Sequence, residues 1–389
     1  MILNASIHAP VATVFAAFTN ATQICEWLCE DAQIEAQTDG RLYLYWRTPK
    51  YYVMGEFLEV EINQHLKLRW QDTENPNPQE VSILFSEENN STNIEMTFEH
   101  QISSQLEKLL TRGFKVLEST QTTGYHLDIL ERPMLGVIVA GAVNADNAAR
   151  YGVPIDYGIA LSDTIPGLSA QVAGLQGGDV LESMNGSKLT DFRSMAAILT
   201  EHKAGDSIRL HFYRGETAHD ATVILQARRL QPYPNSISEL AEQLSKDHQQ
   251  IEQELEAVLV GVSPEHAAKR PSEKTWSANH VLAHLIQTER ENQAFVASLV
   301  VGTELETFSS NLDARVNATL EQHQNTKALL EAFKAVNLET KAMIAALPNE
   351  FLQRKASVVR LQLNGELYTA HPRQHIEQIK RALAAARAA

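Results

Sequence analysis

Residues 166–186 read PGLSAQVAGLQGGDVLESMNG, and this stretch decides how the rest of the chain is divided. Residues 169–175 begin with a serine cap and predict a short helix, which the glycine pair after it ends. Residues 179–184 predict a buried strand, and the Asn-Gly pair that follows predicts a tight turn. This compact unit indicates a domain of its own, with separate domains on either side.

The pattern resembles the signature of PDZ domains of the bacterial protease-associated kind: a small residue, A-G-L, two spacers, G-D and a strand that ends in N-G. The resemblance implies a β-barrel-like PDZ domain over residues 132–230 that binds peptides and brings no catalytic residue. In that family, loop amides hold a peptide C-terminus, and the peptide adds as a strand to an exposed edge, here about residues 137–140. The implied peptide-binding residues are Met134, Leu135, Gly136, Val137, Met195 and Leu199.

Other parts of this segment fit the same expectation. Residues 190–202 predict the helix that walls the groove, and strands at 207–214 and 221–226 close the domain. The connection 141–157 is longer than a tight turn and bears on access to the groove. The alternative is therefore a PDZ fold that only packs on its neighbours.

Length and charge narrow the partners and the location. The 389 residues predict two to four domains. They hold 48 acidic against 33 basic side chains, a net charge of −15, which argues against nucleic acid or an anionic membrane as a partner. No apolar run is long enough to cross a bilayer, and the first residues lack the pattern of a signal peptide. The only cysteines, Cys25 and Cys29, indicate a reducing, cytoplasmic location.

The first segment alternates in the manner of an antiparallel sheet. A strand at 2–7 and a helix that opens at Pro10 are followed by strands between residues 41 and 100. Apolar residues at helical spacing then predict one long helix over 103–130. Cys25 and Cys29, one helical turn apart, could grip a metal, or they are two buried thiols. This order of elements describes a sheet curled around a helix.

The segment resembles the helix-grip, START-related superfamily, in the branch named for activators of the heat-shock-protein ATPase. The residues that carry the resemblance are Ala9-Pro10, Val14 to Thr19, Trp27, Gly40, Trp46, Gly55-Glu56-Phe57 and Leu68-Arg69-Trp70. It implies an α+β domain over residues 1–131 with a cavity between sheet and final helix that takes a small apolar ligand or a protein client. The expected cavity residues are Trp27, Trp46, Trp70 and Phe114. The alternative is that the tryptophans simply fill that space.

Beyond a turn-rich linker, strand patterns mostly stop. Helical patterns at about 236–260, 277–300, 311–347 and 368–388 predict an all-α four-helix bundle over residues 236–389. Two pairs of histidines, His280 with His284 and His371 with His375, are each one helical turn apart. Two imidazoles at this spacing point the same way and can chelate one cation, and a third from a facing helix would complete a site with an open position.

The phrases T-W-S at 275–277, V-L-A-H-L at 281–285 and H-P-R-Q-H-I-E-Q-I at 371–379 resemble the DinB-like (YfiT-like) bundle family. The resemblance implies a divalent metal, zinc or nickel, held by His284, His371 and His375. His280 is either an extra ligand or a neighbour. Pro372 follows His371 directly, so the last helix is expected to start late and to displace His371.

The sequence therefore predicts a multidomain α+β protein. Our first hypothesis is a cytoplasmic modular binding protein, with a ligand- or client-binding helix-grip domain, a peptide-binding PDZ domain and a metal-holding bundle. The alternative is a metal-dependent enzyme of the thiol transferase or hydrolase type that acts in the bundle while the other domains recruit. Its catalytic residues are unknown, because Glu289 and Glu291, the available carboxylates a turn or two beyond His284, belong to no motif. A site open to solvent favours the enzyme, and a closed one favours the scaffold.

Overall fold

The structure is a computed structural model, and it describes residues 1–272, 275–302 and 311–388. The chain divides into two compact units, Leu127–Gln231 and a unit that combines Met1–His126 with Pro232–Ala389. Antiparallel sheets occur in the N-terminal and middle segments, and helices make up the C-terminal segment, which confirms the multidomain α+β class. Among the described helices, none is both long enough and apolar enough to span a membrane.

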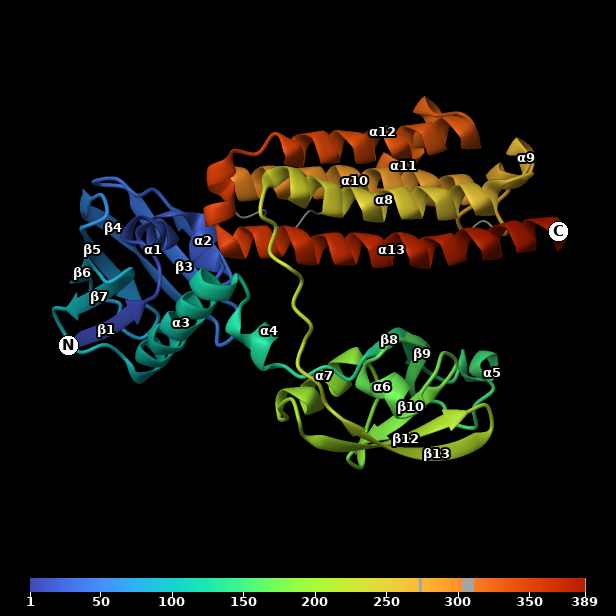
Figure 1. Ribbon diagram of the computed structural model, residues 1–389, viewed down its shortest axis with the longest axis horizontal. Helices are drawn as coiled ribbons and strands as arrows, with labels where there is room; N and C mark the ends of the chain where they lie inside the picture. The colour runs from blue at the N-terminus through green and yellow to red at the C-terminus, as the bar shows by residue number, and fades with distance from the viewer. Residues whose placement is uncertain (273–274, 303–310, 389) are drawn as a thin grey trace. The chain divides into compact units, whose positions relative to one another are not determined.

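The N-terminal domain is one antiparallel sheet of seven strands beside helix α3 (Figure 1). The strand order is β1-β7-β6-β5-β4-β3-β2, so the first strand pairs with the last. Strand residues alternate between buried and exposed, as the sequence pattern predicts, because one face covers the core. The elements are β1 Ile2–Ile7, α1 Val11–Thr19, α2 Ala21–Cys25, β2 Asp31–Ile34, β3 Arg41–Trp46, β4 Tyr51–Glu61, β5 His65–Asp72, β6 Gln79–Glu88, β7 Ser91–Phe98 and α3 Ser104–Thr123.

Helix α3 is shorter than the single helix predicted over 103–130. It begins at the cap Ser103, whose hydroxyl accepts from the Leu106 amide, and it ends at Gly124. Gly124 has a φ of 79°, in the left-handed region where helices commonly stop at glycine. A separate short helix, α4 Leu127–Glu131, follows. The prediction of one long helix was wrong because apolar spacing continued past a glycine that ends the helix.

The middle unit is a small antiparallel sheet in the order β13-β12-β10-β9-β8, with β11 added to β10. Strand β8 lies at one end of this order and has an unpaired edge among the described strands. Helix α7 begins at Asp191, whose side chain accepts from the Ser194 amide in a capping box. The elements are β8 Val137–Val143, α5 Ala148–Tyr151, β9 Gly158–Thr164, α6 Ser169–Val172, β10 Val180–Met184, β11 Ser187–Lys188, α7 Phe192–Thr200, β12 Ser207–Arg214 and β13 Thr217–Ile224.

The Gly-Gly-Asp step of the central motif is explained by packing. A Cβ on Gly177 would lie 2.4 Å from the Ser162 carbonyl oxygen, so no larger residue fits there. Asp179 is fully buried, and its carboxylate pairs with Arg214 through two hydrogen bonds of 2.8 and 2.9 Å. This bidentate pair is costly to break, because removal of Arg214 would leave the buried charge of Asp179 without a counter-charge. The turn pair after β10, Asn185 and Gly186, has positive φ at both positions, as a hairpin turn requires.

The C-terminal segment forms a helical bundle in which α8, α10, α12 and α13 run side by side (Figure 1). Helix α13 is longer than expected and runs straight through Pro372, so the predicted late start was wrong. Proline inside a helix costs about 3 kcal/mol, and the packing of α13 along α8 and α10 offsets that cost. The elements are α8 Ile237–Leu259, α9 Pro264–Ala268, α10 Ala278–Val301, α11 Leu312–Gln322, α12 Thr326–Ala345, the 3-10 helix η1 Asn349–Gln353 and α13 Lys355–Ala388.

The helix-grip domain and the bundle are packed together within one unit. The carboxylate of Glu26, after α2, accepts a hydrogen bond of 2.7 Å from the buried Ser357 hydroxyl of α13. Arg360 lies 3.6 Å from the same carboxylate, and Lys355 donates to the Thr122 carbonyl at 3.1 Å. Because Glu26 is only 9% exposed, its charge depends on these partners.

We expect Glu26→Ala to destabilise both halves of this unit together, by about 1–3 kcal/mol, because the Ser357 hydroxyl loses its buried acceptor. Differential scanning calorimetry measures the effect as a lower midpoint of the transition that contains these two domains. Glu56→Ala is the control, since Glu56 forms only an exposed pair with Arg69. Equal midpoints for the two variants would contradict the role assigned to Glu26.

Candidate functional site

Three histidines from two helices of the bundle converge on one point. His284 lies on α10, and His371 and His375 lie one turn apart on α13. One ring nitrogen from each lies within 4.8 Å of the others, and the ring centroids are 4.4 to 5.2 Å apart. The structure thus brings together the three residues named from the sequence. Each imidazole is partly buried, so the cluster is shielded without being sealed.

A neighbouring glutamine sets which nitrogen of His375 is free. The Nδ1 atom of His375 lies 2.8 Å from the Gln378 amide oxygen, which can only accept, so Nδ1 carries the hydrogen. The lone pair is then on Nε2, which faces His371 Nε2 at 2.9 Å. This is the second-sphere arrangement that orients a histidine toward a metal. Nδ1 of His284 and Nδ1 of His371 are buried without a hydrogen-bond partner among the described residues.

The environment keeps the three rings neutral. Burial, followed by the neighbouring His375 and His371, lowers the pKa of His284 to about 4. Burial also lowers the pKa of His371 and of His375 below the usual value for imidazole. Desolvation penalises the charged form, and the neutral ring is the form that binds a metal. Three neutral nitrogen ligands of this kind suit zinc or nickel, with room for a further ligand.

The histidine cluster opens into a pocket of about 680 Å³. This volume is in the range of small-molecule sites. His284 and His375 form part of its wall, so a ligand in the pocket would reach the cluster directly. The remaining lining residues come from the segment before α10, the start of α11 and the last turns of α13: Pro271, Thr275, Trp276, Leu312, Gln378, Arg381, Ala382 and Ala385.

Other polar candidates of the bundle have different partners. His280 is outside the cluster, and its Nδ1 lies 2.7 Å from the hydroxyl of the cap Ser277. Glu291 pairs with Arg315 at 2.5 Å. Glu289 is buried and accepts hydrogen bonds from Thr340 and Asn292 on the side of α10 that faces the core. Neither carboxylate lines the pocket, so the structure adds no catalytic assignment for them.

The predicted peptide-binding residues lie where strand β8 faces helix α7. Met195 and Leu199 point into the core of this unit, with Val137 packed against it. Met134 bridges to Gln226, and the carbonyls of Leu135 and Gly136 accept from Ala170 and Ile165.

The loop before β8 presents two amides. The N–H groups of Leu135 and Gly136 have no hydrogen-bond partner among the described residues, although both carbonyls are occupied. Gly136 has a φ of 84°, and a Cβ there would lie 2.5 Å from the Leu168 Cβ. Only glycine therefore keeps this loop in place. Adjacent unpaired amides are suited to a carboxylate, the group that ends a peptide.

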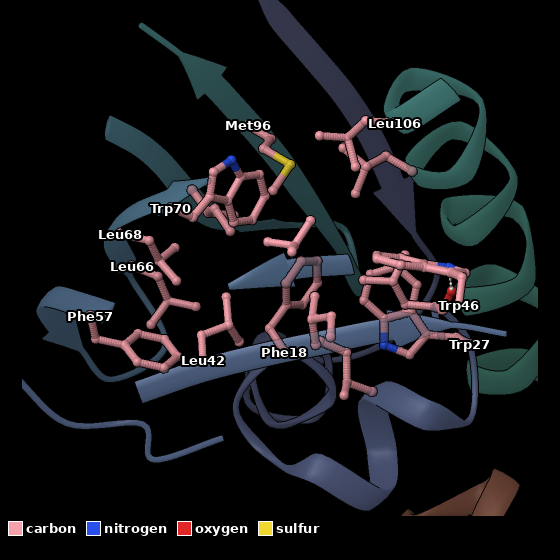
Figure 2. Close-up of a pocket in the computed structure, with 16 residues that line it drawn as sticks. Phe18, Trp27, Leu42, Trp46, Phe57, Leu66, Leu68, Trp70, Met96 and Leu106 are labelled. Carbon is pink, nitrogen blue, oxygen red and sulfur yellow. Dashed lines mark hydrogen bonds between the residues drawn. The ribbon is translucent and has the colours of Figure 1, made fainter. Parts of the chain in front are cut away.

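The tryptophans of the N-terminal domain fill the space between sheet and helix (Figure 2). Only about 30 Å³ remains among sixteen lining residues, enough for one or two waters. Trp27 and Trp46 donate from Nε1 to the carbonyls of Ala17 and Leu28, and Phe114 stacks on Trp27 with a centroid distance of 6.1 Å. An organic ligand would have to displace these rings.

The two cysteines behave as buried or half-buried thiols. Cys29 is 6% exposed, and a hydrogen bond with Cys25 together with burial raises its pKa well above the usual thiol value. Since only the thiolate binds metal well, this environment disfavours a metal. Among the described residues, neither cysteine belongs to a group of three metal-binding side chains.

Comparison with known proteins identifies two of the domains. Residues 8–118 match the family model of Activator of Hsp90 ATPase homolog 1-like protein, and residues 130–212 match that of the PDZ domain. The chain therefore contains an N-terminal helix-grip domain of this kind and a PDZ domain, as the sequence predicts.

Curated relatives share only part of the chain. A probable periplasmic serine protease do/HhoA-like of Haemophilus influenzae is 34% identical over 28% of this chain and 25% of its own length. The periplasmic pH-dependent serine endoprotease DegQ of Escherichia coli is 26% identical over 25% of this chain and 21% of its own length. The chain thus spans about a quarter of the length of these relatives.

Solved structures resemble part of the fold. A protein from Staphylococcus saprophyticus is 17% identical over 33% of this chain and 96% of its own, with a TM-score of 0.27. An HSP90 activator from Plasmodium falciparum is 17% identical over 28% of this chain and 84% of its own, with a TM-score of 0.22.

We expect Trp70→Ala to lower the free energy of unfolding by about 3–5 kcal/mol, because the ring is 3% exposed and its removal leaves an apolar cavity. Denaturant titration followed by circular dichroism measures the loss. Benzene should then raise the melting midpoint of the variant and leave the wild type unchanged, since an enlarged dry cavity can bind it. Met54→Ala, at a 41% exposed position, is the control. A benzene effect in the wild type would show that the interior is not filled.

Proposed function

We propose that this protein is a metal-dependent enzyme of the thiol transferase or hydrolase type, whose DinB-like bundle holds a zinc or nickel ion and whose other two domains recruit its substrate. The observation that carries the proposal is the convergence of His284, His371 and His375 on the wall of an open pocket. A divalent metal bound there would supply Lewis-acid activation of a water or a thiol.

The residues of the chain fit such an ion. Burial keeps the three imidazoles neutral, and Gln378 fixes the tautomer of His375 so that Nε2 is the free nitrogen. His284 contributes from the facing helix, which gives three protein ligands and leaves a position for a small molecule. The chain's own part is to hold these rings in place and to admit a ligand through the adjoining pocket.

The open pocket favours an enzyme over a structural metal. A structural zinc site is closed by four protein ligands, whereas a catalytic site has three and an accessible position. Within the described residues, the cluster comprises three histidines and adjoins about 680 Å³ of open space. The runner-up function, a scaffold with a structural ion, would need that space to be filled by apolar side chains.

The PDZ domain is proposed to bind the C-terminus of a peptide or protein. The two unpaired amides of Leu135 and Gly136 lie beside the free edge of β8, which supports addition of a peptide strand there. The similarity to periplasmic serine proteases is consistent with a protein as the recruited partner.

The helix-grip domain is proposed to bind a protein client by its surface. Its interior has too little free space for an apolar ligand without movement of the tryptophans. The outer face of the sheet has a separate hollow of about 540 Å³ lined by Tyr43, Met54 and Arg69, among others. An exposed methionine and a half-buried tyrosine between charged side chains are typical of a protein contact surface.

A reducing compartment is the proposed location. Cys25 and Cys29 are both free thiols, and their ready pairing in an oxidising environment would disturb the buried end of α2. We therefore propose that the protein acts in the cytoplasm.

We expect purified protein to contain one divalent ion per chain, and His284→Ala or His375→Ala to lose it, because each removes one of three ligands. The loss of affinity should exceed the about 10–100-fold caused by removing an outer-sphere partner. Elemental analysis measures occupancy, and His280→Ala is the matched control, since His280 faces Ser277. Full occupancy in both ligand variants would refute the site. In the cobalt-loaded protein, a visible spectrum that 2-mercaptoethanol leaves unchanged would favour the scaffold.

We expect peptides with a free carboxylate and an apolar last residue to bind the PDZ domain, and the same peptides with an amidated C-terminus to bind much more weakly. Gly136→Ala should reduce affinity about tenfold or more, because the new Cβ meets Leu168 and displaces the loop amides. Gly174→Ala is the control, with the same φ of 84° and open space around its Cβ. Fluorescence anisotropy measures both, and equal losses would exclude a loop-specific effect.

A further inference from the structure

The pocket beside the histidines is lined mostly by apolar or small side chains and by one charged side chain. Its walls are apolar or small at Pro271, Trp276, Leu312, Ala382 and Ala385. Among the described lining residues there is one full positive charge, Arg381, and no carboxylate. In a chain with 48 acidic and 33 basic side chains, a pocket without an acidic residue is a selective environment.

Arg381 differs from two nearby cations of its helix, Lys380 and Arg373. Lys380 pairs with Glu377 at 2.6 Å, and Arg373 pairs with Glu254 at 3.5 Å. Among the described residues, Arg381 has neither an ion pair nor a hydrogen-bond partner. Its guanidinium can therefore bind an external anion without first losing an internal partner. A carboxylate is the planar anion that a guanidinium binds through two parallel hydrogen bonds.

The spacing of His375 and Arg381 along α13 bears on the length of the ligand. Arg381 follows His375 by six residues, which is about 9 Å along the axis at about 1.5 Å per residue. Ala382 and Ala385, which follow Arg381 on α13, also line the pocket with small side chains. A molecule that follows this stretch from the histidine cluster to Arg381 would be elongated.

The body of that ligand has an aromatic surface to lie against. Trp276 contacts His284, with ring centroids 5.3 Å apart, and it lines the pocket. The carbonyl of Thr275, the residue before it, accepts a hydrogen bond of 2.8 Å from Arg270 Nε. An indole held in this way favours a flat or apolar group over a polar one.

We propose that the pocket binds an elongated organic carboxylate, with its carboxylate on Arg381, its apolar or aromatic body along Trp276 and its other end at the histidine cluster. This inference rests on the proposed function, because it names the class of substrate that the metal site would act on. It assigns to Arg381 a role in substrate selection and to Trp276 a role in positioning the body of the molecule.

The test compares an acid with its neutral counterpart. Isothermal titration calorimetry would measure 4-phenylbutyrate and 4-phenylbutanamide binding to the nickel-loaded and the metal-free full-length chain. We expect the acid to bind about tenfold or more tightly than the amide, and Arg381→Gln to remove that difference. Lys380→Gln is the matched control. It removes one positive charge from the residue directly before Arg381, and that lysine is already paired with Glu377.

The outcomes separate this inference from the proposed function. If nickel binds with full occupancy but the acid and the amide bind equally, or neither binds, the carboxylate pocket is wrong and the metal site stands. If the metal-free chain prefers the acid through Arg381 but no metal binds, the pocket stands and the metal site fails. Equal losses in Arg381→Gln and Lys380→Gln would overturn the role of Arg381. Trp276→Ala should weaken the acid and the amide alike.

Discussion

The packing of α13 along α8 and α10 is the constraint on which the rest of the larger unit depends. Near its start, Ser357 and Arg360 hold the buried carboxylate of Glu26 in the helix-grip domain. Further along, the same helix brings His371 and His375 to His284 of α10. One rigid element thus connects the domain contact with the candidate site. Because bending a helix costs free energy, a shift of α13 at the domain contact is expected to move the histidines at the candidate site as well.

Burial does two things for the histidine cluster. It lowers the pKa of all three rings, so that they stay neutral, and it shields them in part from solvent. The cost is that buried nitrogens of His284 and His371 have no hydrogen-bond partner among the described residues. Such unsatisfied buried groups destabilise the fold. The fit for a metal therefore comes from the chemistry of the donors and from their spacing.

Local signals made the middle domain predictable, and long-range packing limited the prediction elsewhere. The Gly-Gly-Asp step and the Asn-Gly turn act within a few residues, so the sequence predicted β10 and its flanks correctly. The end of α3 at Gly124 was also readable but was outweighed by apolar spacing. The passage of α13 through Pro372 was not readable, since it depends on the neighbouring helices. The histidines were named from their motif. The roles of Gln378 and Arg381 could be inferred only from the structure, from the contact of Gln378 with His375 and from the position of both residues in the pocket lining.

The PDZ domain and the helix-grip domain differ in what they present to a partner: free backbone amides in one, and the surface around a filled interior in the other. In the proposed function, the backbone amides of the PDZ loop would hold a carboxyl terminus and leave selection to the side chains of the groove. The helix-grip interior offers almost no free volume, so selection there must occur on its surface. A filled core resists small ligands, because opening it loses the packing of several aromatic rings at once. In the proposed function, recruitment by the surfaces of these two domains and chemistry in the pocket of the bundle would therefore occur in different parts of the chain.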